Sequence, residues 1–302
     1  SDSLIPVLSR SLGIAQEYSP PIIWQQLSNV MLDTPPVDKT GWDTWLDAYE
    51  ILAYTLIQMP VIKPELQELA DRRYQALTGY LHAHGQSCES ILEAEASRIR
   101  LGFVTPDEYK KLFLLTEMLD CTATATRDTV RRRAVRLAPT PFILLRVAES
   151  YLEDEQFWEA QKYMLKASQA EKNPYYKSLI ELRLAGLYVI RRSFRSARLH
   201  ARQADELNPE WGRPWLFLAD LVETSGAICA SNEMERWALA YLAMEYCEKA
   251  VRINPSLEPE VTGRMNSLRH KVPELMELGF MGLQIGDRIP VACWINETAR
   301  VR

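Results

Sequence analysis

The feature that most constrains this fold is a pair of alanines seven positions apart, which recurs three times in the second half of the chain. In the clearest copy, Ala197 and Ala204 are followed by Pro209. Residues seven apart lie on one face of a helix, and small side chains there let a second helix approach closely. Before each of these pairs of alanines comes another helical stretch, in which a large residue is followed directly by alanine. The sequence therefore predicts three pairs of antiparallel helices. The equivalent positions are Val147-Ala148, Ala160 and Ala167; Leu184-Ala185, Ala197 and Ala204; and Leu218-Ala219, Ala243 and Ala250.

The spacing of the copies indicates the kind of repeat. Ala160 and Ala197 lie 37 residues apart (197 − 160), and a proline follows each second helix. Units of about 34 residues that form two antiparallel helices resemble tetratricopeptide (TPR) repeats. We therefore expect an all-α protein built as a right-handed TPR-like helical-repeat solenoid, with three units over residues 140–255.

The third unit is longer than the others. Pro209 and Pro255 lie 46 residues apart (255 − 209), which is about a dozen more than one unit requires. The excess falls at residues 224–235, where we expect an inserted turn. Insertions in repeat proteins map to one face of the molecule, often the binding face.

The first 139 residues carry weaker helix patterns. Residues 86–139 are expected to form a degenerate TPR-like unit, whose first helix, Asp107 to Leu119, starts at a capping box formed by Thr105 and Glu108. Residues 1–85 are expected to form further helical pairs with the same architecture. Apolar residues at helical spacing predict helices at Ile22 to Leu32, at Trp42 to Met59 with Pro60 as its end, and at Glu65 to His82.

The last segment, residues 256–302, has a different pattern. Leu257 to Lys271 is expected to be a helix that caps the solenoid. Arg288 to Ile295 and Thr298 to Val301 mix β-branched and aromatic residues on either side of Asn296-Glu297. This pattern predicts a short extended tail or β-hairpin after the capping helix.

Composition and motifs exclude several functions. The net charge of −5 argues against a dedicated nucleic-acid binder, which carries a basic excess. No apolar run reaches the roughly 18 residues of a membrane span, so we expect no transmembrane segment. The five cysteines form no C-x-x-C pair, and the chain lacks phosphate-loop, G-x-S-x-G and HExxH motifs. We therefore expect no metal, no cofactor and no catalytic residue.

Two sets of side chains are candidates for contact with a partner. The first helices of TPR units line the concave groove, and their mixed polarity here suits an extended or helical segment of an unidentified protein. The groove candidates are Arg146, Glu149, Arg183, Arg213, Phe217 and Asp220. The second set is a basic stripe that is either a solvated face with local acidic partners or a patch for an acidic partner or anionic surface. It comprises Arg191, Arg195, Arg198 and Arg202.

The tail and the long third unit make residues 85–302 resemble one particular family, the exported TPR proteins of Bacteroidota. The tail carries Gly286-Asp287-Arg288, then Trp294-Ile295-Asn296-Glu297-Thr298, but has Val291-Ala292-Cys293 where the family has a glycine-rich segment. The resemblance implies an exported protein in the periplasm or associated with the outer membrane, with its signal peptide removed. It does not imply a catalytic activity. The sequence alone leaves a cytoplasmic location open.

The resemblance also bears on the cysteines, because Ser87 to Ile91 and Asp120 to Thr122 match the family. Cys88 would begin one helix and Cys121 would end the next, and these ends lie side by side in an antiparallel hairpin. An exported location would allow a disulfide there. The alternative is a pair of buried free thiols that serve packing. Cys229, Cys247 and Cys293 remain unassigned.

Three functions from different classes follow. The leading hypothesis is an interaction scaffold of the bacterial cell envelope that binds a protein segment in the TPR groove. The second is a permanent structural subunit of an outer-membrane or secretion assembly, which should expose a large apolar patch. The third is an enzyme with an unrecognised site, which should show a convergent polar pocket with perturbed pKa values.

Overall fold

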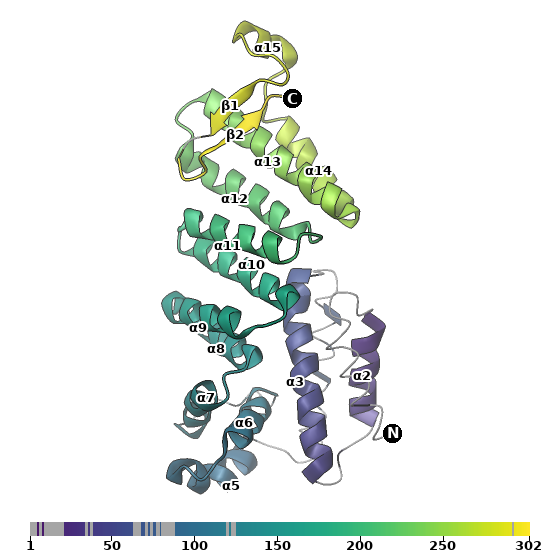
Figure 1. Ribbon diagram of the computed structural model, residues 1–302, viewed down its shortest axis with the longest axis vertical. Coiled ribbons are helices and arrows are strands. Elements are labelled where there is room, and N and C mark those ends of the chain that lie inside the picture. Colours follow the sequence, from purple (N-terminus) through teal and green to yellow (C-terminus); the bar gives the residue numbers. More distant parts are fainter. Residues whose placement is uncertain are drawn as a thin grey trace. The chain divides into compact units, whose positions relative to one another are not determined.

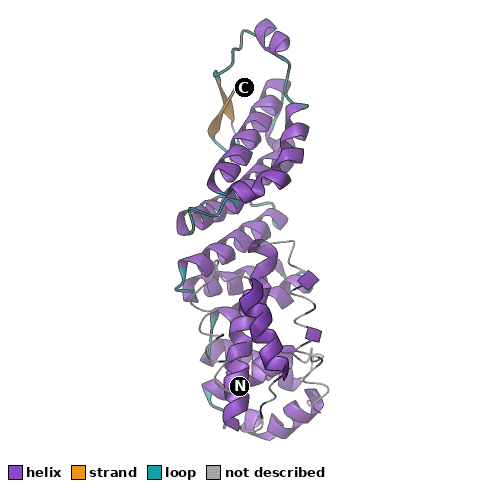
Figure 2. Ribbon diagram, turned by 90° about the vertical axis from the view of Figure 1, so that its right-hand side faces the viewer, coloured by secondary structure: helices purple, strands orange, loops and turns teal. Residues whose placement is uncertain are grey.

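The computed structural model is mostly helical and ends in a two-stranded antiparallel sheet (Figures 1 and 2). It describes residues 5, 8, 21–33, 36, 39–62, 68–69, 72, 75–76, 79, 88–118, 121, 125–291 and 293–302. The chain divides into two compact units, unit 1 (Ser1–Lys172) and unit 2 (Asn173–Arg302). The division falls inside the segment for which three repeats are expected.

Unit 1 contains a helical core rich in aromatic side chains. Trp24, Trp45, Tyr49, Tyr109 and Phe113 are at most 1% exposed. Their burial removes a large apolar area from water, which is the main favourable contribution to folding. The helices are α2 (Pro21–Asp33), α3 (Lys39–Ile62), α5 (Cys88–Leu101), α6 (Pro106–Met118), α7 (Ala125–Leu137), α8 (Pro141–Glu153) and α9 (Phe157–Ala170).

The long helix α3 connects separate parts of unit 1 through polar contacts. The hydroxyl of Thr140, just before α8, donates to Glu50 at 2.9 Å, and the Tyr54 hydroxyl donates to Glu171 at 2.6 Å, just after α9. Lys110 of α6 forms an ion pair with Glu50 at 3.0 Å. The region before the repeats is therefore part of one compact unit with α6 to α9.

The expected helices near the N-terminus agree with α2 and α3, with one correction. Pro60 does not end the second helix, because α3 continues to Ile62. A proline removes one amide donor from a helix, but a last turn can continue when only one or two residues follow. Residues 68–69, 72, 75–76 and 79 are helical, and the rest of the helix expected at Glu65 to His82 lies outside the described residues.

The repeat pattern corresponds to consecutive helices that pack in pairs. In unit 1, α6 packs against α7 and α8 against α9; in unit 2, α10 (Pro174–Ile190) packs against α11 (Phe194–Leu207) and α12 (Arg213–Cys229) against α13 (Glu233–Ile253). The alanines that define the pattern are all 0% exposed, as expected for sites of close helix approach. They are Ala148, Ala160, Ala167, Ala185, Ala197, Ala204, Ala219, Ala243 and Ala250.

Local sequence signals set the starts of these helices. The capping box expected before α6 is present: the Thr105 hydroxyl accepts from the Glu108 amide at 3.3 Å, and Glu108 accepts from the Thr105 amide at 2.8 Å. The backbone hydrogen bond from Thr105 and the side-chain bond from Arg98 lower the pKa of Glu108 to about 2. Pro174 was expected to close a unit, but it begins α10, where its missing amide costs nothing.

The extra residues of the third pair are helical, which corrects the expected inserted turn. Helix α10 ends five residues after Ala185 (190 − 185), whereas α12 ends ten residues after Ala219 (229 − 219). Helix α11 begins three residues before Ala197 (197 − 194), whereas α13 begins ten before Ala243 (243 − 233). Three residues join α10 to α11 and three join α12 to α13, so the insertion lengthens both helices and leaves the length of the connection unchanged.

The C-terminal segment folds back onto α13. A short 3-10 turn, η3 (Pro255–Leu257), leads into the expected capping helix, α14 (Glu258–Arg269). The expected hairpin is present as β1 (Arg288–Val291) and β2 (Glu297–Arg300), paired antiparallel with Ile289 opposite Ala299. Both strands contact α13 (Figure 1). A six-residue helix, α15 (Leu275–Phe280), precedes the sheet and was not expected from the sequence.

Candidate protein-binding groove

A groove lies where the lengthened part of α13 meets the end of α14 and the segment around α15. It consists of two adjoining cavities of about 380 and 490 Å³, which share Glu233, Trp237 and Lys271 as lining residues. We call this feature the α13–α15 groove. Its remaining lining residues are Glu223, Arg236, Leu239, Ala240, Leu268, His270, Val272, Pro273, Glu277, Phe280 and Met281.

The insertion supplies one wall of this groove. Glu233, Arg236 and Trp237 belong to the seven residues by which α13 extends further than α11. The start of this extension is held by capping contacts, because Asn232 accepts from the Glu235 amide at 2.9 Å. The Ser231 amide and hydroxyl donate to Glu235 at 2.6 and 2.7 Å. The Ser231 backbone bond, followed by the Ser231 hydroxyl, lowers the pKa of Glu235.

An ion-pair network holds α14 in place beside the groove. Arg264 of α14 contacts Asp220 at 2.5 Å and Glu223 at 2.6 Å, and Lys271 contacts Glu223 at 2.9 Å. Partial burial raises the pKa of the Glu223 carboxyl, but hydrogen bonds from Lys271 and Arg264 outweigh this effect and lower it. Glu223 is therefore held as a carboxylate at neutral pH, and it connects α12 to the end of α14.

Large apolar side chains of the groove lining are exposed: Phe280 is 85% and Met281 46% exposed, and Trp237 is half-buried within the groove. Met276, in the same short helix as Phe280, is 70% exposed. Helix α15, which carries Met276 and Phe280, is joined to the rest of unit 2 through loops on both sides (Figure 2). Exposed methionine and aromatic side chains that cluster beside a cavity are typical of surfaces that bind other proteins.

Charged side chains of both signs stand around the groove. Glu233 and Arg236 come from α13, Lys271 follows α14, and Glu277 lies in α15. Glu277 also completes the capping box of α15 with Glu274. An apolar floor with acidic and basic groups at its rim can hold an amphipathic polypeptide segment, because the apolar stripe is buried while the charges select register.

The residues expected to line a concave TPR groove are distributed over both units. Arg146 and Glu149 lie in unit 1, where Arg146 pairs with Glu149 at 2.9 Å and with Glu117 at 3.1 Å. In unit 2, Arg213 pairs with Glu260 at 3.1 Å and Asp220 with Arg264. Arg183 and Phe217 are half-buried. Their role in binding a partner remains a prediction, and two of the α12 candidates already bind α14.

The basic stripe begins at Arg191, just after α10, and continues along α11, and its residues have different surroundings. Arg198 donates to the carbonyl oxygen of Ile295 at 2.7 Å and pairs with Glu297. Arg202 pairs with Glu297 at 3.2 Å and lies 4.0 Å from the centre of the Trp215 ring. These two arginines fit the interpretation of local acidic pairing.

The other two arginines of the stripe have different surroundings. The guanidinium of Arg191 lies 5.9 Å from the centre of the Tyr188 ring, and Arg195 is exposed. A role for them toward an acidic partner remains a prediction.

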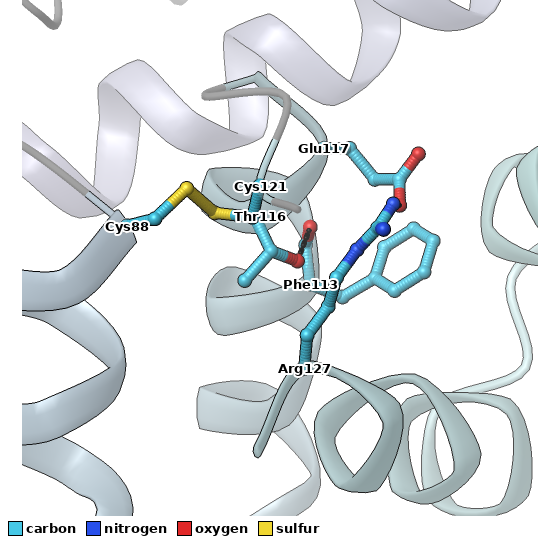
Figure 3. The surroundings of a disulfide bond; sticks show 6 residues. All are labelled: Cys88, Phe113, Thr116, Glu117, Cys121 and Arg127. Carbon is cyan, nitrogen blue, oxygen red and sulfur yellow. Dashed lines mark hydrogen bonds and ion pairs between the residues drawn. A yellow bond between two sulfur atoms is a disulfide. The ribbon is translucent and has the colours of Figure 1, made fainter. Parts of the chain in front are cut away.

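The disulfide expected between Cys88 and Cys121 is present, with 5.5 Å between the Cα atoms. It joins the start of α5 to Cys121, three residues beyond the end of α6. Cys121 is held further by its amide, which donates to the Thr116 carbonyl at 3.1 Å. Figure 3 shows Thr116 beside the bridge, with Arg127 and Glu117 directed toward each other at 3.6 Å.

A second disulfide, Cys229–Cys293, was left open by the sequence. It links the last residue of α12 to the loop between β1 and β2. Cys229 lies in the insertion at 224–235 and Cys293 in the C-terminal tail. That both segments depart from a plain repeat is the one sequence signal that could have suggested the pairing. Cys247 is a buried free thiol in α13, and burial raises its pKa to about 11.

Within the described ranges, His, Cys, Asp and Glu side chains never gather in threes suited to a metal ion. Among the same residues, no helix has both the length and the apolar character needed to cross a membrane. A comparison with models of known protein families finds none that matches this chain. A comparison with curated protein sequences likewise finds no match.

Proposed function

We propose that this chain is a non-catalytic protein-interaction scaffold whose helix pairs belong to a right-handed TPR-like solenoid. The repeat assignment is supported by the fully buried alanines at equivalent positions of three successive helix pairs. The observation that carries the binding function is the α13–α15 groove, where an insertion in a repeat builds the wall of a cavity lined by exposed Phe280 and Met281.

The chemistry of the groove favours one kind of ligand. Trp237 and Leu268 offer apolar surface in the cavity, and Arg236, Glu233 and Lys271 stand around it. A protein segment with an apolar stripe and flanking charges of both signs would satisfy all of these groups. Such a segment would bury the exposed methionine and phenylalanine, which supplies most of the favourable free energy of binding.

We further propose that the protein works in the cell envelope of a Bacteroidota bacterium, in the periplasm or at the outer membrane. The resemblance of the tail and of the long third unit to an exported TPR family supports this location. The two disulfides also support it, because such bonds persist in oxidising compartments and are rare in the cytosol.

A second candidate function is that of a permanent subunit in an outer-membrane or secretion assembly. It is favoured by the exposed apolar side chains of this segment, since a constant neighbour would cover Met276, Phe280 and Met281. The two functions differ in lifetime: a transient partner dissociates on dilution, whereas a permanent one copurifies in fixed stoichiometry.

The test is affinity capture from native envelope extract with the wild-type chain, a groove variant and a control. Phe280→Ser alters the groove edge, and Leu199→Ser removes an exposed leucine of α11, 57% exposed, away from the groove. We expect the first variant to retain about a tenth or less of the captured protein and the control to retain all of it. Equal capture by all three chains would refute the groove as the binding surface.

Sedimentation of the captured complex then separates the two functions. Dissociation into free chain and partner at nanomolar concentration indicates a transient scaffold. A complex that stays intact with fixed stoichiometry indicates a permanent subunit.

A further inference from the structure

The two disulfides of this protein differ in their access to solvent. Cys121 is buried, at 2% exposure, and Cys88 is half-buried. In the second bridge Cys293 is exposed, in the loop that connects β1 to β2, and Cys229 is half-buried at the end of α12. Thiol–disulfide exchange requires a thiolate to reach a sulfur atom, so access separates a reactive bridge from a structural one.

The hairpin that carries Cys293 is held in place without the bridge. Ile289, Val291, Ile295, Ala299 and Val301 are at most 4% exposed. Burial of five apolar side chains against α13 and its neighbours keeps the strands docked.

Polar contacts fix the hairpin at several further points. Ile295 accepts from Arg198 at 2.7 Å, the Arg300 amide donates to Glu245 at 2.7 Å, and the Gly286 amide donates to the Val301 carbonyl at 2.8 Å. Glu297 binds Arg198, Arg202 and the Tyr246 hydroxyl. Opening the Cys229–Cys293 bond therefore leaves the sheet docked on α13.

The loop between β1 and β2 has an unfavourable backbone conformation that can change once the disulfide opens. Cys293 has φ of 67° and Asn296 has φ of 49°. The left-handed region is unfavourable for a cysteine, because its Cβ crowds the backbone, whereas asparagine tolerates it better. The bond to Cys229 is one of the constraints on this conformation, so reduction releases the loop around residue 293 while the strands remain in place.

We propose that Cys229–Cys293 is a thiol–disulfide exchange site for a dithiol oxidoreductase, and that Cys88–Cys121 is a structural bridge. A thiolate of the reductant attacks the Cys293 sulfur, the bond to Cys229 breaks, and Cys229 leaves as a thiolate. The second thiol of the reductant then attacks its own sulfur in the mixed disulfide and releases Cys293. Two electrons pass from the dithiol, which becomes a disulfide, and the two protein thiolates take up the two protons.

This site adds a covalent control point beside the α13–α15 groove. Cys229 precedes the three-residue turn that leads to Glu233, the first groove residue of α13. Exchange therefore changes the covalent attachment of the insertion that supplies one wall of the groove. The exchange reaction itself does not depend on the proposed binding function.

The test uses dithiothreitol as the dithiol, on the folded full-length protein, followed by alkylation and peptide mapping over time. We expect Cys229 and Cys293 to be alkylated at least about 10-fold faster than Cys88 and Cys121, because of their greater access. The circular dichroism spectrum should stay unchanged while the first pair reacts, and Cys247 should stay unmodified.

Two double variants serve as matched controls. The Cys229→Ser, Cys293→Ser protein should lose the fast phase and keep the slow one, and the Cys88→Ser, Cys121→Ser protein should do the reverse. If the latter fails to fold, the wild-type time course alone still decides. Reduction of Cys88–Cys121 first, equal rates for both bridges, or opening of Cys229–Cys293 only with loss of helical signal would overturn the proposal.

Discussion

The two helix pairs of unit 2, α10–α11 and α12–α13, use the same small residues for packing but differ beyond them. Ala185, Ala197 and Ala204 in the first pair correspond to Ala219, Ala243 and Ala250 in the second, and all are fully buried. The second pair extends both helices past this shared part and ends in a disulfide and a groove. The first pair contains no cysteine and therefore no disulfide.

This difference shows how a repeat gains a binding surface without loss of its packing. Close approach of two helices needs small residues only where the axes are nearest. Residues added at the far ends of both helices leave that region untouched. The added turns therefore place Trp237 and Arg236 in the lining of a cavity whose other side comes from α14 and α15. A helix pair as short as α10–α11 would lack these residues.

The largest expected effect tests whether the two pairs share their packing. Ala197→Leu and Ala243→Leu each add three carbons where the native side chain is 0% exposed. We expect each change to lower the free energy of unfolding by about 3 kcal/mol, because the neighbouring helix cannot give way without strain. Urea unfolding measures this, with Glu206→Leu at an exposed site of α11 as the control. Tolerance of Ala243→Leu alone would show that the long pair packs differently.

A pair of glycines gives a sharper contrast with a smaller effect. A Cβ at Gly212 would collide with the Ala250 carbonyl oxygen and lie 2.8 Å from Leu257 Cδ1. We expect Gly212→Ala to cost about 2 kcal/mol. A Cβ at Gly186 in α10 meets nothing within 4 Å, so Gly186→Ala should stabilise by about 0.5–1 kcal/mol through helix propensity. Thermal unfolding of both variants measures these effects, and a shift of the melting temperature in the same direction for both would contradict the expected contrast.

The smallest expected effect is a loss of stability of the α12–α13 pair at low pH, which we attribute to Glu223. Its pKa in the folded protein lies below the ordinary value of 4.5. Its stabilising contribution is therefore complete above pH 4.5 and disappears as the pH falls through the folded pKa. We expect Glu223→Gln to be less stable than the wild type at pH 7 and the gap to narrow at low pH. A gap that stayed constant between pH 7 and pH 3 in urea unfolding would contradict this assignment.

Local signals made much of the fold predictable. Alanines seven apart identified the helix pairs, because helix periodicity places them on one face whatever surrounds them. Thr105 and Glu108 located the start of α6, and the β-branched residues around Asn296 predicted the hairpin. The Cys88–Cys121 bridge was also anticipated, since it joins neighbouring helix ends. Each of these features depends on residues within about one repeat of each other.

Features that depend on distant contacts were not predictable. The extra length between Pro209 and Pro255 suggested an inserted turn at 224–235, yet Gly226 lies inside α12 and Glu233 begins α13. A single glycine costs a helix only about 1 kcal/mol, which the surrounding packing offsets. The candidate groove was missed because its walls come from α13, α14 and α15. The sequence left Arg198 and Arg202 open between local acidic pairing and a patch for a partner, because nothing near them in the sequence reveals that Glu297 folds back against them.

The helix pairs, their small contact residues and the extended tail are evident in the sequence, because they follow from periodicity and backbone preference within a few turns of chain. The helical insertion, the contact of Cys229 with Cys293 across 64 residues and the groove beside Trp237 became evident only in the folded protein. Those outcomes depend on which surfaces are close enough to exclude water or form a bond. That proximity is a property of the folded chain as a whole, and no short stretch of sequence encodes it.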